Sequence, residues 1–260
     1  MSSKPIGIFD SGVGGLSIWN EIHQLLPMES TIYLSDSKHA PYGPKGKETI
    51  INLSVKNTEW LINQGCKLIV VACNTATTNA IDTLRKNYPI PFIGIEPAIK
   101  PAALQSKSKA IGILATKGTL SSQLFHKTSE LYSSDLLVVE QVGNGIVELI
   151  ENGALYSDEM KNLLQSYLQP MLDAEIDCLV LGCTHYHFLT PILKQLLPKH
   201  VKIIDSGKAV AKQTKSVLES NSLLNIKTPI KANHFYTNGE EKVIASLLKS
   251  EAFSLQKLAF

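Results

Sequence analysis

Two stretches decide the fold: LIVVACNT (residues 68–75) and CLVLGCTH (residues 178–185). Each has a short aliphatic run that ends at a cysteine and is followed by polar residues. Apolar runs of this length without alternation are typical of strands that are covered on both faces of a parallel sheet. Because the two stretches match each other, we interpret them as the same strand in two copies of one unit.

The repeat extends outward from these stretches. Eight short apolar runs are predicted as buried strands, in two matching sets of four: 6–9, 31–34, 68–72 and 92–95, then 111–114, 136–139, 178–182 and 201–204. Helical patterns lie between them, for example at 47–64, 79–86, 160–173 and 189–197. Strands that alternate with helices indicate βαβ units. We therefore predict an α/β fold of two similar parallel-sheet domains, related by pseudo-two-fold symmetry.

The segment EPAIKPA (96–102) is interpreted as a crossover between the halves. We expect residues 1–97 together with 207–260 to form the first α/β domain, and residues 98–206 the second. The tail contains one further strand candidate, 234–237, and is expected to pack on the first half. Ligands of open α/β sheets bind beyond the carboxyl ends of the strands, so the active site is predicted in the cleft between the domains.

Composition excludes several classes of protein. The 260 residues are 44% hydrophobic and 18% charged, a globular balance that excludes a disordered chain or a coiled coil. A formal net charge of only +2 argues against a nucleic-acid partner. No apolar run approaches the length of about 20 residues that a membrane span needs. The start, MSSKPIGIFD, has no apolar segment of the secretory type, so we expect a cytoplasmic protein with free thiols.

Two of the four cysteines stand out, because Cys73 and Cys183 follow matching strands and precede polar residues. Cys66 and Cys178 are interpreted as small buried hydrophobes. A thiol at a strand-to-helix turn is expected to meet helix N-terminal amides, which favour the thiolate. Thiols that face each other across a cleft suit the inversion of a carbon centre: one removes a hydrogen as thiolate and the other delivers one as thiol.

Other interpretations stay open on the residues alone. The run DSGVGG (10–15) follows a strand, as a dinucleotide-binding loop does, but Ser17 stands where that fingerprint has its third glycine. The glycines also fit a plain tight turn. A protein that binds an amino acid, a nucleic acid or another protein without turnover is a further alternative.

A metal site and a cysteine hydrolase are two more alternatives. Cys183, His185 and His187 are close in sequence, and Cys73 is a candidate fourth ligand, but the alternating spacing turns neighbouring side chains in different directions. A hydrolase with Cys183 as nucleophile and His185 as base leaves Cys73 unexplained.

Five motifs, taken together, resemble the glutamate racemase family, the cofactor-independent branch of the aspartate/glutamate racemase superfamily: GIFDSGVGGLS (7–17), SDSKHAPYG (35–43), VVACNTATT (70–78), ELIENG (148–153) and LVLGCTHY (179–186). The resemblance implies an isomerase that interconverts L- and D-glutamate and supplies D-glutamate for bacterial peptidoglycan, and thus for cell wall biogenesis and cell shape. It also implies no pyridoxal phosphate or other cofactor, no metal and a homodimer. The choice of glutamate over aspartate rests on the resemblance, since one methylene is worth only about 1–3 kcal/mol in a pocket.

The resemblance also implies roles for individual residues. Cys73 matches the cysteine that exchanges the proton on the D-glutamate side, and Cys183 matches its partner on the L-glutamate side. Asp10 is implied to assist Cys73, His185 to assist Cys183, and Glu151 to be an auxiliary carboxylate.

Substrate-binding residues are implied at eight positions: Asp10, Ser11, Tyr42, Gly43, Asn74, Thr75, Thr184 and His185. Three further polar residues match the cleft of the family: Asp36, Thr116 and Thr119. Glutamate carries two carboxylates and an ammonium group, so a set rich in hydrogen-bond donors, with Asp10 as acceptor, suits it chemically.

Overall fold

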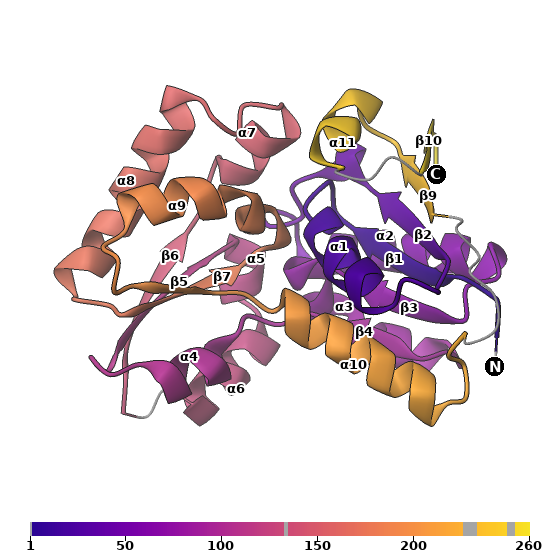
Figure 1. Ribbon diagram of the computed structural model, residues 1–260, viewed down its shortest axis with the longest axis horizontal. Helices are drawn as coiled ribbons and strands as arrows, with labels where there is room; N and C mark the ends of the chain where they lie inside the picture. Colours follow the sequence, from indigo (N-terminus) through magenta and orange to yellow (C-terminus); the bar gives the residue numbers. More distant parts are fainter. Residues whose placement is uncertain (1, 133–134, 226–232, 249–252) are drawn as a thin grey trace.

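The computed structural model describes residues 2–132, 135–225, 233–248 and 253–260. Two parallel sheets lie side by side (Figure 1). The first has the order β10 (Ser254–Lys257), β9 (Asn233–Thr237), β2 (Thr31–Ser35), β1 (Ile6–Asp10), β3 (Leu68–Val71), β4 (Phe92–Gly94). The second has the order β6 (Leu137–Val142), β5 (Ala110–Ala115), β7 (Cys178–Gly182), β8 (Lys202–Ile204). The predicted α/β fold with two parallel sheets is confirmed.

Helices cover both faces of each sheet. The first sheet is accompanied by α1 (Leu16–Leu25), α2 (Lys47–Asn63), α3 (Asn74–Asn87), α10 (Gly207–Ser220) and α11 (Glu241–Leu247). The second is accompanied by α4 (Ile99–Gln105), α5 (Lys117–Leu120), α6 (Gln123–Tyr132), α7 (Ile146–Glu151), α8 (Asp158–Asp173) and α9 (Thr190–Leu196). Two short 3₁₀ helices, η1 (Ser37–His39) and η2 (Thr184–Leu189), follow β2 and β7.

Alternate residues of one strand feed different cores, which explains why the strands lack a polar face. Ile8 of β1 belongs to the same apolar cluster as Ile22 of α1, whereas the next residue, Phe9, belongs to a cluster with Leu61 of α2. The first of these clusters also takes in Ile150 of α7, so an apolar core runs from one half into the other.

The structure corrects the predicted strands in two respects. The runs 136–139 and 201–204 were expected to be buried, but β6 and β8 are exposed or half-buried along their length. Both are edge strands with a single neighbour, so one side of each remains open. The tail contributes β10 as well as the expected β9; SLQK (254–257) has no apolar run and could not be recognised as a strand.

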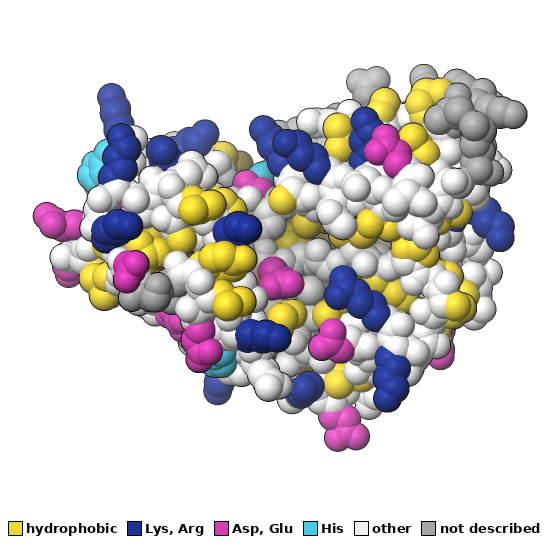
Figure 2. All heavy atoms as spheres, turned by 90° about the horizontal axis from the view of Figure 1, so that it is seen from below, with side chains coloured by type: hydrophobic (Ala, Val, Ile, Leu, Met, Phe, Trp, Pro, Cys, Tyr) yellow, Lys and Arg dark blue, Asp and Glu magenta, His cyan; other side chains and the backbone are white. Residues whose placement is uncertain are grey.

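The chain crosses between the sheets twice, after β4 and after β8, and the crossovers touch: Ser206 Oγ donates to the carbonyl of Glu96. The expected division into residues 1–97 with 207–260 and residues 98–206 stays a prediction. On the face shown in Figure 2, basic and acidic side chains are interspersed. Among the described residues, none of the helices combines the length and the apolar character that crossing a bilayer demands.

Candidate active site

Cys73 lies at the carboxyl end of β3 and caps the N-terminus of α3. Its sulfur accepts a hydrogen bond from the backbone N–H of Ala76 at 3.4 Å and donates one to Ser11 Oγ at 3.5 Å. The residue is only 4% exposed. The chain leaves the sheet here as expected, and the helix starts directly behind the thiol.

Burial opposes the effect of this helix terminus on the pKa of Cys73. Burial and the charge of Asp10 raise the pKa of the Cys73 thiol well above its ordinary value, and the hydrogen bonds with Ser11 and Ala76 offset only part of this rise. The helix amide of Ala76 lowers the pKa of Cys73, as expected, but desolvation outweighs this hydrogen bond.

Cys183 has a different environment from Cys73. It follows β7 directly, but the next element is η2, and the α-helix begins only at Thr190, so no helix amide caps the sulfur. Instead its sulfur lies 3.9 Å from Nδ1 of His185, whose Nε2 lies 2.6 Å from Glu151 Oε1. The expected matching helix terminus is thus absent at Cys183, and an imidazole takes its place.

His185 is fully buried, and burial by itself would lower its pKa. The contacts with Cys183 and Glu151 outweigh burial and hold the pKa of His185 well above its ordinary value. A cationic imidazole beside a sulfur is the arrangement that stabilises a thiolate. The two thiols therefore differ: burial raises the pKa of Cys73, whereas Cys183 lies beside an imidazole that can carry positive charge.

Asp10 lies between the loop that follows β1 and the residue that follows Cys183. It ends β1, and its side chain accepts hydrogen bonds from Thr184 Oγ1 and from the backbone of Gly12, both at 3.2 Å. Burial, together with the charge of Glu151, raises the pKa of Asp10, which the charge of His185 opposes. Cys183 itself contributes to the raised pKa of Cys73, so the thiols are close enough to influence each other.

The glycines of the DSGVGG run allow close approach between the halves. A Cβ atom at Gly12 would overlap Glu151 Oε1, and one at Gly14 would overlap His185. Tyr33 Oη holds the carbonyl of Gly12 at 2.7 Å. The run therefore wraps around the His185–Glu151 pair, which gives its glycines a packing reason independent of any nucleotide.

Hydrogen-bond donors collect next to Cys73. Asn74 is 3% exposed, and neither its amide nitrogen nor its amide oxygen has a hydrogen-bond partner within the protein. The hydroxyl of Thr75 lies 2.7 Å from that of Thr116 and 3.3 Å from that of Thr119, so the two halves meet in a cluster of hydroxyls. Gly43 packs against Thr116. Buried polar groups cost free energy when unpaired, so this region is suited to a polar ligand.

Tyr42 and Asp36 form a separate arrangement. Tyr42 Oη donates to Asp36 Oδ2 at 2.5 Å, while Asp36 Oδ1 takes hydrogen bonds from His39 and Asn238. None of these bonds reaches a thiol. The Asp36 carboxylate instead ties Tyr42 to His39 and Asn238, while its backbone N–H donates to the carbonyl of Asp10.

Sequence reasoning missed three side chains that hold the site together. Ser37 donates to Glu151, Tyr33 donates to the glycine loop, and Asn238 holds the η1 turn. Tyr33 lies inside a strand read only for its apolar character, although a buried tyrosine hydroxyl usually needs a partner. Ser37 lies within the motif SDSKHAPYG (35–43), but its partner, Glu151, is in the other half of the chain. Asn238 precedes a glycine, which signals a turn and nothing more.

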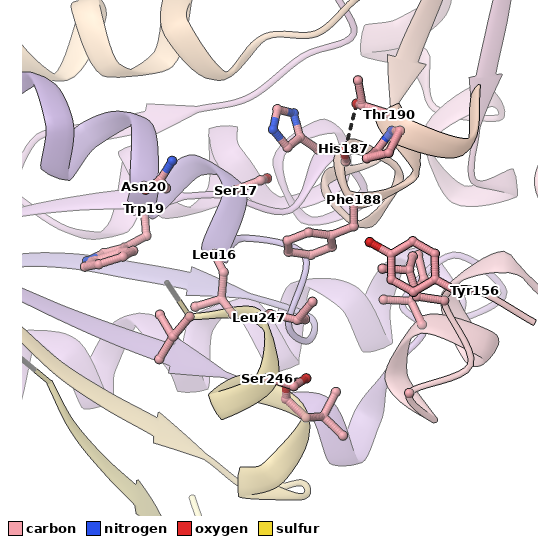
Figure 3. Close-up of a pocket in the computed structure, with 16 residues that line it drawn as sticks. Leu16, Ser17, Trp19, Asn20, Tyr156, His187, Phe188, Thr190, Ser246 and Leu247 are labelled. Atoms are coloured by element: carbon pink, nitrogen blue, oxygen red, sulfur yellow. Dashed lines mark hydrogen bonds between the residues drawn. The ribbon is translucent and has the colours of Figure 1, made fainter. Parts of the chain in front are cut away.

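A cavity of about 540 Å³ lies outside the thiol network, with Leu16, Tyr156 and Phe188 among its lining residues (Figure 3). His187 also lines it and pairs with Asp205 at 3.6 Å, so it does not join Cys183 and His185 as a metal ligand would. Within the described ranges, no group of three or more His, Cys, Asp or Glu side chains is arranged to hold a metal ion.

Comparison with known proteins gives concordant matches. The model of the Asp/Glu/Hydantoin racemase family matches residues 6–214. A glutamate racemase of Ectopseudomonas mendocina is 46% identical over 248 residues, covering 95% of this chain and 94% of the relative. The Escherichia coli glutamate racemase in complex with L-glutamate and the activator UDP-MurNAc-ala superposes with a TM-score of 0.87 at 33% identity, covering 98% of both chains. The Francisella tularensis glutamate racemase in complex with D-glutamate has a TM-score of 0.84 at 30% identity, covering 100% of this chain and 98% of the other.

Proposed function

The chain belongs to the Asp/Glu/hydantoin racemase family, and on that premise we propose that it interconverts L- and D-glutamate by two-base proton transfer at Cα. One observation carries the mechanism: the two halves each supply a buried thiol, and the charges of the two thiols interact. Cys73 is influenced by the charge of Asp10, and Cys183 lies beside the His185–Glu151 pair. The reaction needs one acid and one base at opposite faces of a carbon, and two unlike thiols supply both.

In the direction from L- to D-glutamate, the Cys183 thiolate removes the proton from Cα. Cys73, as thiol, then delivers a proton to the opposite face, so the two sulfur atoms end with exchanged protonation states. In the reverse direction Cys73 is the base and Cys183 the acid. The raised pKa of Cys73 suits it to the role of acid in the first direction.

The negative charge that develops on the substrate must be stabilised by fixed donors in a site closed to water. The proposed donors come from Ser11, Asn74, Thr75 and Thr184, and Asp10 is the proposed acceptor for the ammonium group. Tyr42 and Gly43 are proposed to border the same site, with Thr116 and Thr119 contributing hydroxyls from the second half. The names of the curated relatives support glutamate over aspartate. No cofactor is required by this chemistry.

We further propose a cellular role and an oligomeric state for this chain. D-glutamate made by this chain would enter peptidoglycan synthesis in the cytoplasm, and the chain would act as a homodimer. The proposed domains are residues 1–97 with 207–260 and residues 98–206, a division that the two separate sheets support. Analytical ultracentrifugation of the purified protein tests the homodimer, and a monomer at all concentrations would refute it.

Single cysteine substitutions test the mechanism. Cys73→Ser and Cys183→Ser should each nearly abolish racemisation, followed by circular dichroism of glutamate, with little change in stability. Cys66→Ala and Cys178→Ala are matched controls, because both are buried thiols outside the network, and they should remain active. Full turnover in both serine variants would falsify the assignment.

Heavy water gives an independent measurement. If the proton is taken by one thiol and delivered by the other, product formed early in deuterium oxide carries deuterium at Cα. Mass spectrometry of the product measures the label, and unlabelled product would contradict deprotonation.

A further inference from the structure

The carboxylate of Glu151 is held from both halves of the molecule. Its Oε1 accepts the backbone N–H of Val13 at 2.7 Å and lies 2.6 Å from His185 Nε2. Its Oε2 accepts the hydroxyl of Ser37 at 2.8 Å. Among the described residues, Ser37 supplies the one hydrogen bond to Oε2, so the two oxygens have separate partners.

Ser37 is itself fixed from several sides. Its hydroxyl lies 3.0 Å from that of Ser35. Its Cβ packs so closely against Gly239 that a Cβ atom at position 239 would overlap it. The η1 turn that carries it is held by Asn238, whose Oδ1 accepts the backbone N–H of Lys38 at 2.8 Å. The Ser37 hydroxyl therefore reaches Glu151 from a rigid support.

We propose that Ser37 is a positioning residue: by holding Oε2 of Glu151 it aims Oε1 at His185, and so keeps the imidazole next to Cys183. The side chain of Glu151 is 13% exposed, so without Ser37 water can reach Oε2 and the carboxylate can turn. A small misalignment of a group that supports proton transfer costs rate even when every catalytic group remains present.

The position of Ser37 adds a condition to this alignment. Ser37 follows a strand of the first sheet, whereas Glu151, His185 and Cys183 belong to elements of the second. The Cys183 side of the site is therefore assembled from both halves of the chain, and its alignment depends on the contact between them.

Kinetics of Ser37→Ala and Ser37→Thr test the proposal, which rests on the proposed racemase function. Ser37→Ala should lower kcat/KM by about tenfold, mainly through kcat, as expected for loss of a hydrogen bond to a charged group. The loss must be equal in both directions, because enantiomers have the same free energy. Ser37→Thr keeps the hydroxyl and should restore most of the rate. Ser54→Ala, which removes a buried hydroxyl bonded to Ile50 in α2, should leave the rate unchanged.

Nuclear magnetic resonance of the His185 ring gives a readout that does not depend on turnover. The charged and titratable groups around His185 are Glu151 from α7, Cys183 after β7 and Asp10 from β1. With Glu151 released, the pKa of His185 should fall in Ser37→Ala and stay raised in Ser37→Thr and Ser54→Ala.

The two readouts separate the proposals. A folded Ser37→Ala protein with an unchanged His185 titration overturns the positioning role, whatever its activity. If the wild-type protein does not racemise glutamate but His185 still responds to Ser37→Ala, the proposed function fails and the positioning role stands.

Discussion

Replacing Asn74 by alanine is expected to weaken substrate binding without weakening the fold. Asn74 is the buried residue that follows Cys73 in the chain, and neither its amide nitrogen nor its carbonyl oxygen has a hydrogen-bond partner. Asn79, five positions later in the same helix, is the matched control: its amide donates to the carbonyls of Thr75 and Gly118 at 2.9 and 3.1 Å.

The structure sets the size of both effects. Asn74→Ala breaks no hydrogen bond within the protein and removes an unsatisfied group that costs about 1–3 kcal/mol, so the free energy of unfolding should stay constant or rise. Asn79→Ala loses these two hydrogen bonds and a third to Thr78 Oγ1 at 3.3 Å, and should lower that free energy by about 1–2 kcal/mol. A hydrogen bond to a charged substrate group contributes about 1.5–3 kcal/mol, so Asn74→Ala should lower kcat/KM by about tenfold to a hundredfold.

Urea unfolding measures stability, and circular dichroism of glutamate measures racemisation. The rise in melting temperature on adding glutamate reports binding without turnover, and it should shrink in Asn74→Ala. The reasoning is refuted if Asn74→Ala is destabilised as much as Asn79→Ala while its kinetics match the wild type.

Three further perturbations have definite expected outcomes. Glu151→Gln removes a cause of the raised pKa of His185, so the alkaline limb of the pH–rate profile should move to lower pH. The His185–Glu151 pair stabilises the fold at pH values below the pKa of an unfolded imidazole, and this stabilisation is lost as pH rises through the raised pKa of folded His185. The difference in free energy of unfolding between wild type and variant should therefore narrow with rising pH. Gly14→Ala drives a Cβ into the backbone of His185 and should lower the free energy of unfolding by about 1–3 kcal/mol and also lower activity, whereas Gly46→Ala, with open space around it, should leave activity unchanged. A chelator such as EDTA should leave racemisation unchanged, and a loss restored by zinc would favour a metal site instead.

Internal symmetry made the central strands predictable from sequence. Buried parallel strands need apolar residues on both faces, so the apolar runs around Ile8 and Val180 could be predicted as strands. Edge strands carry weaker signals, because one of their sides meets solvent; β6 and β8 were read as buried, and β10 was not read at all.

The site was predictable as a set of residues but not as an electrostatic arrangement. Cys73 and Cys183 occupy matching positions in the repeat, yet one sulfur lies at an α-helix terminus and the other beside an imidazole. The local sequence does not reveal how deeply a thiol is buried, and burial is what decides the pKa of Cys73. The roles of Ser37 and Asn238 depend on partners more than a hundred residues away in the chain, as the separation between Ser37 and Glu151 shows.

The place of β9 beside β2 has a consequence for biosynthesis. The whole second half of the chain lies between these neighbours, so a ribosome must translate all of it before the edge of β2 finds its partner. Until then the nascent first sheet ends in an unpaired strand, the kind of edge that recruits other chains and aggregates. The second sheet is contiguous in sequence, so all four of its strands are synthesised while the edge of β2 is still unpaired.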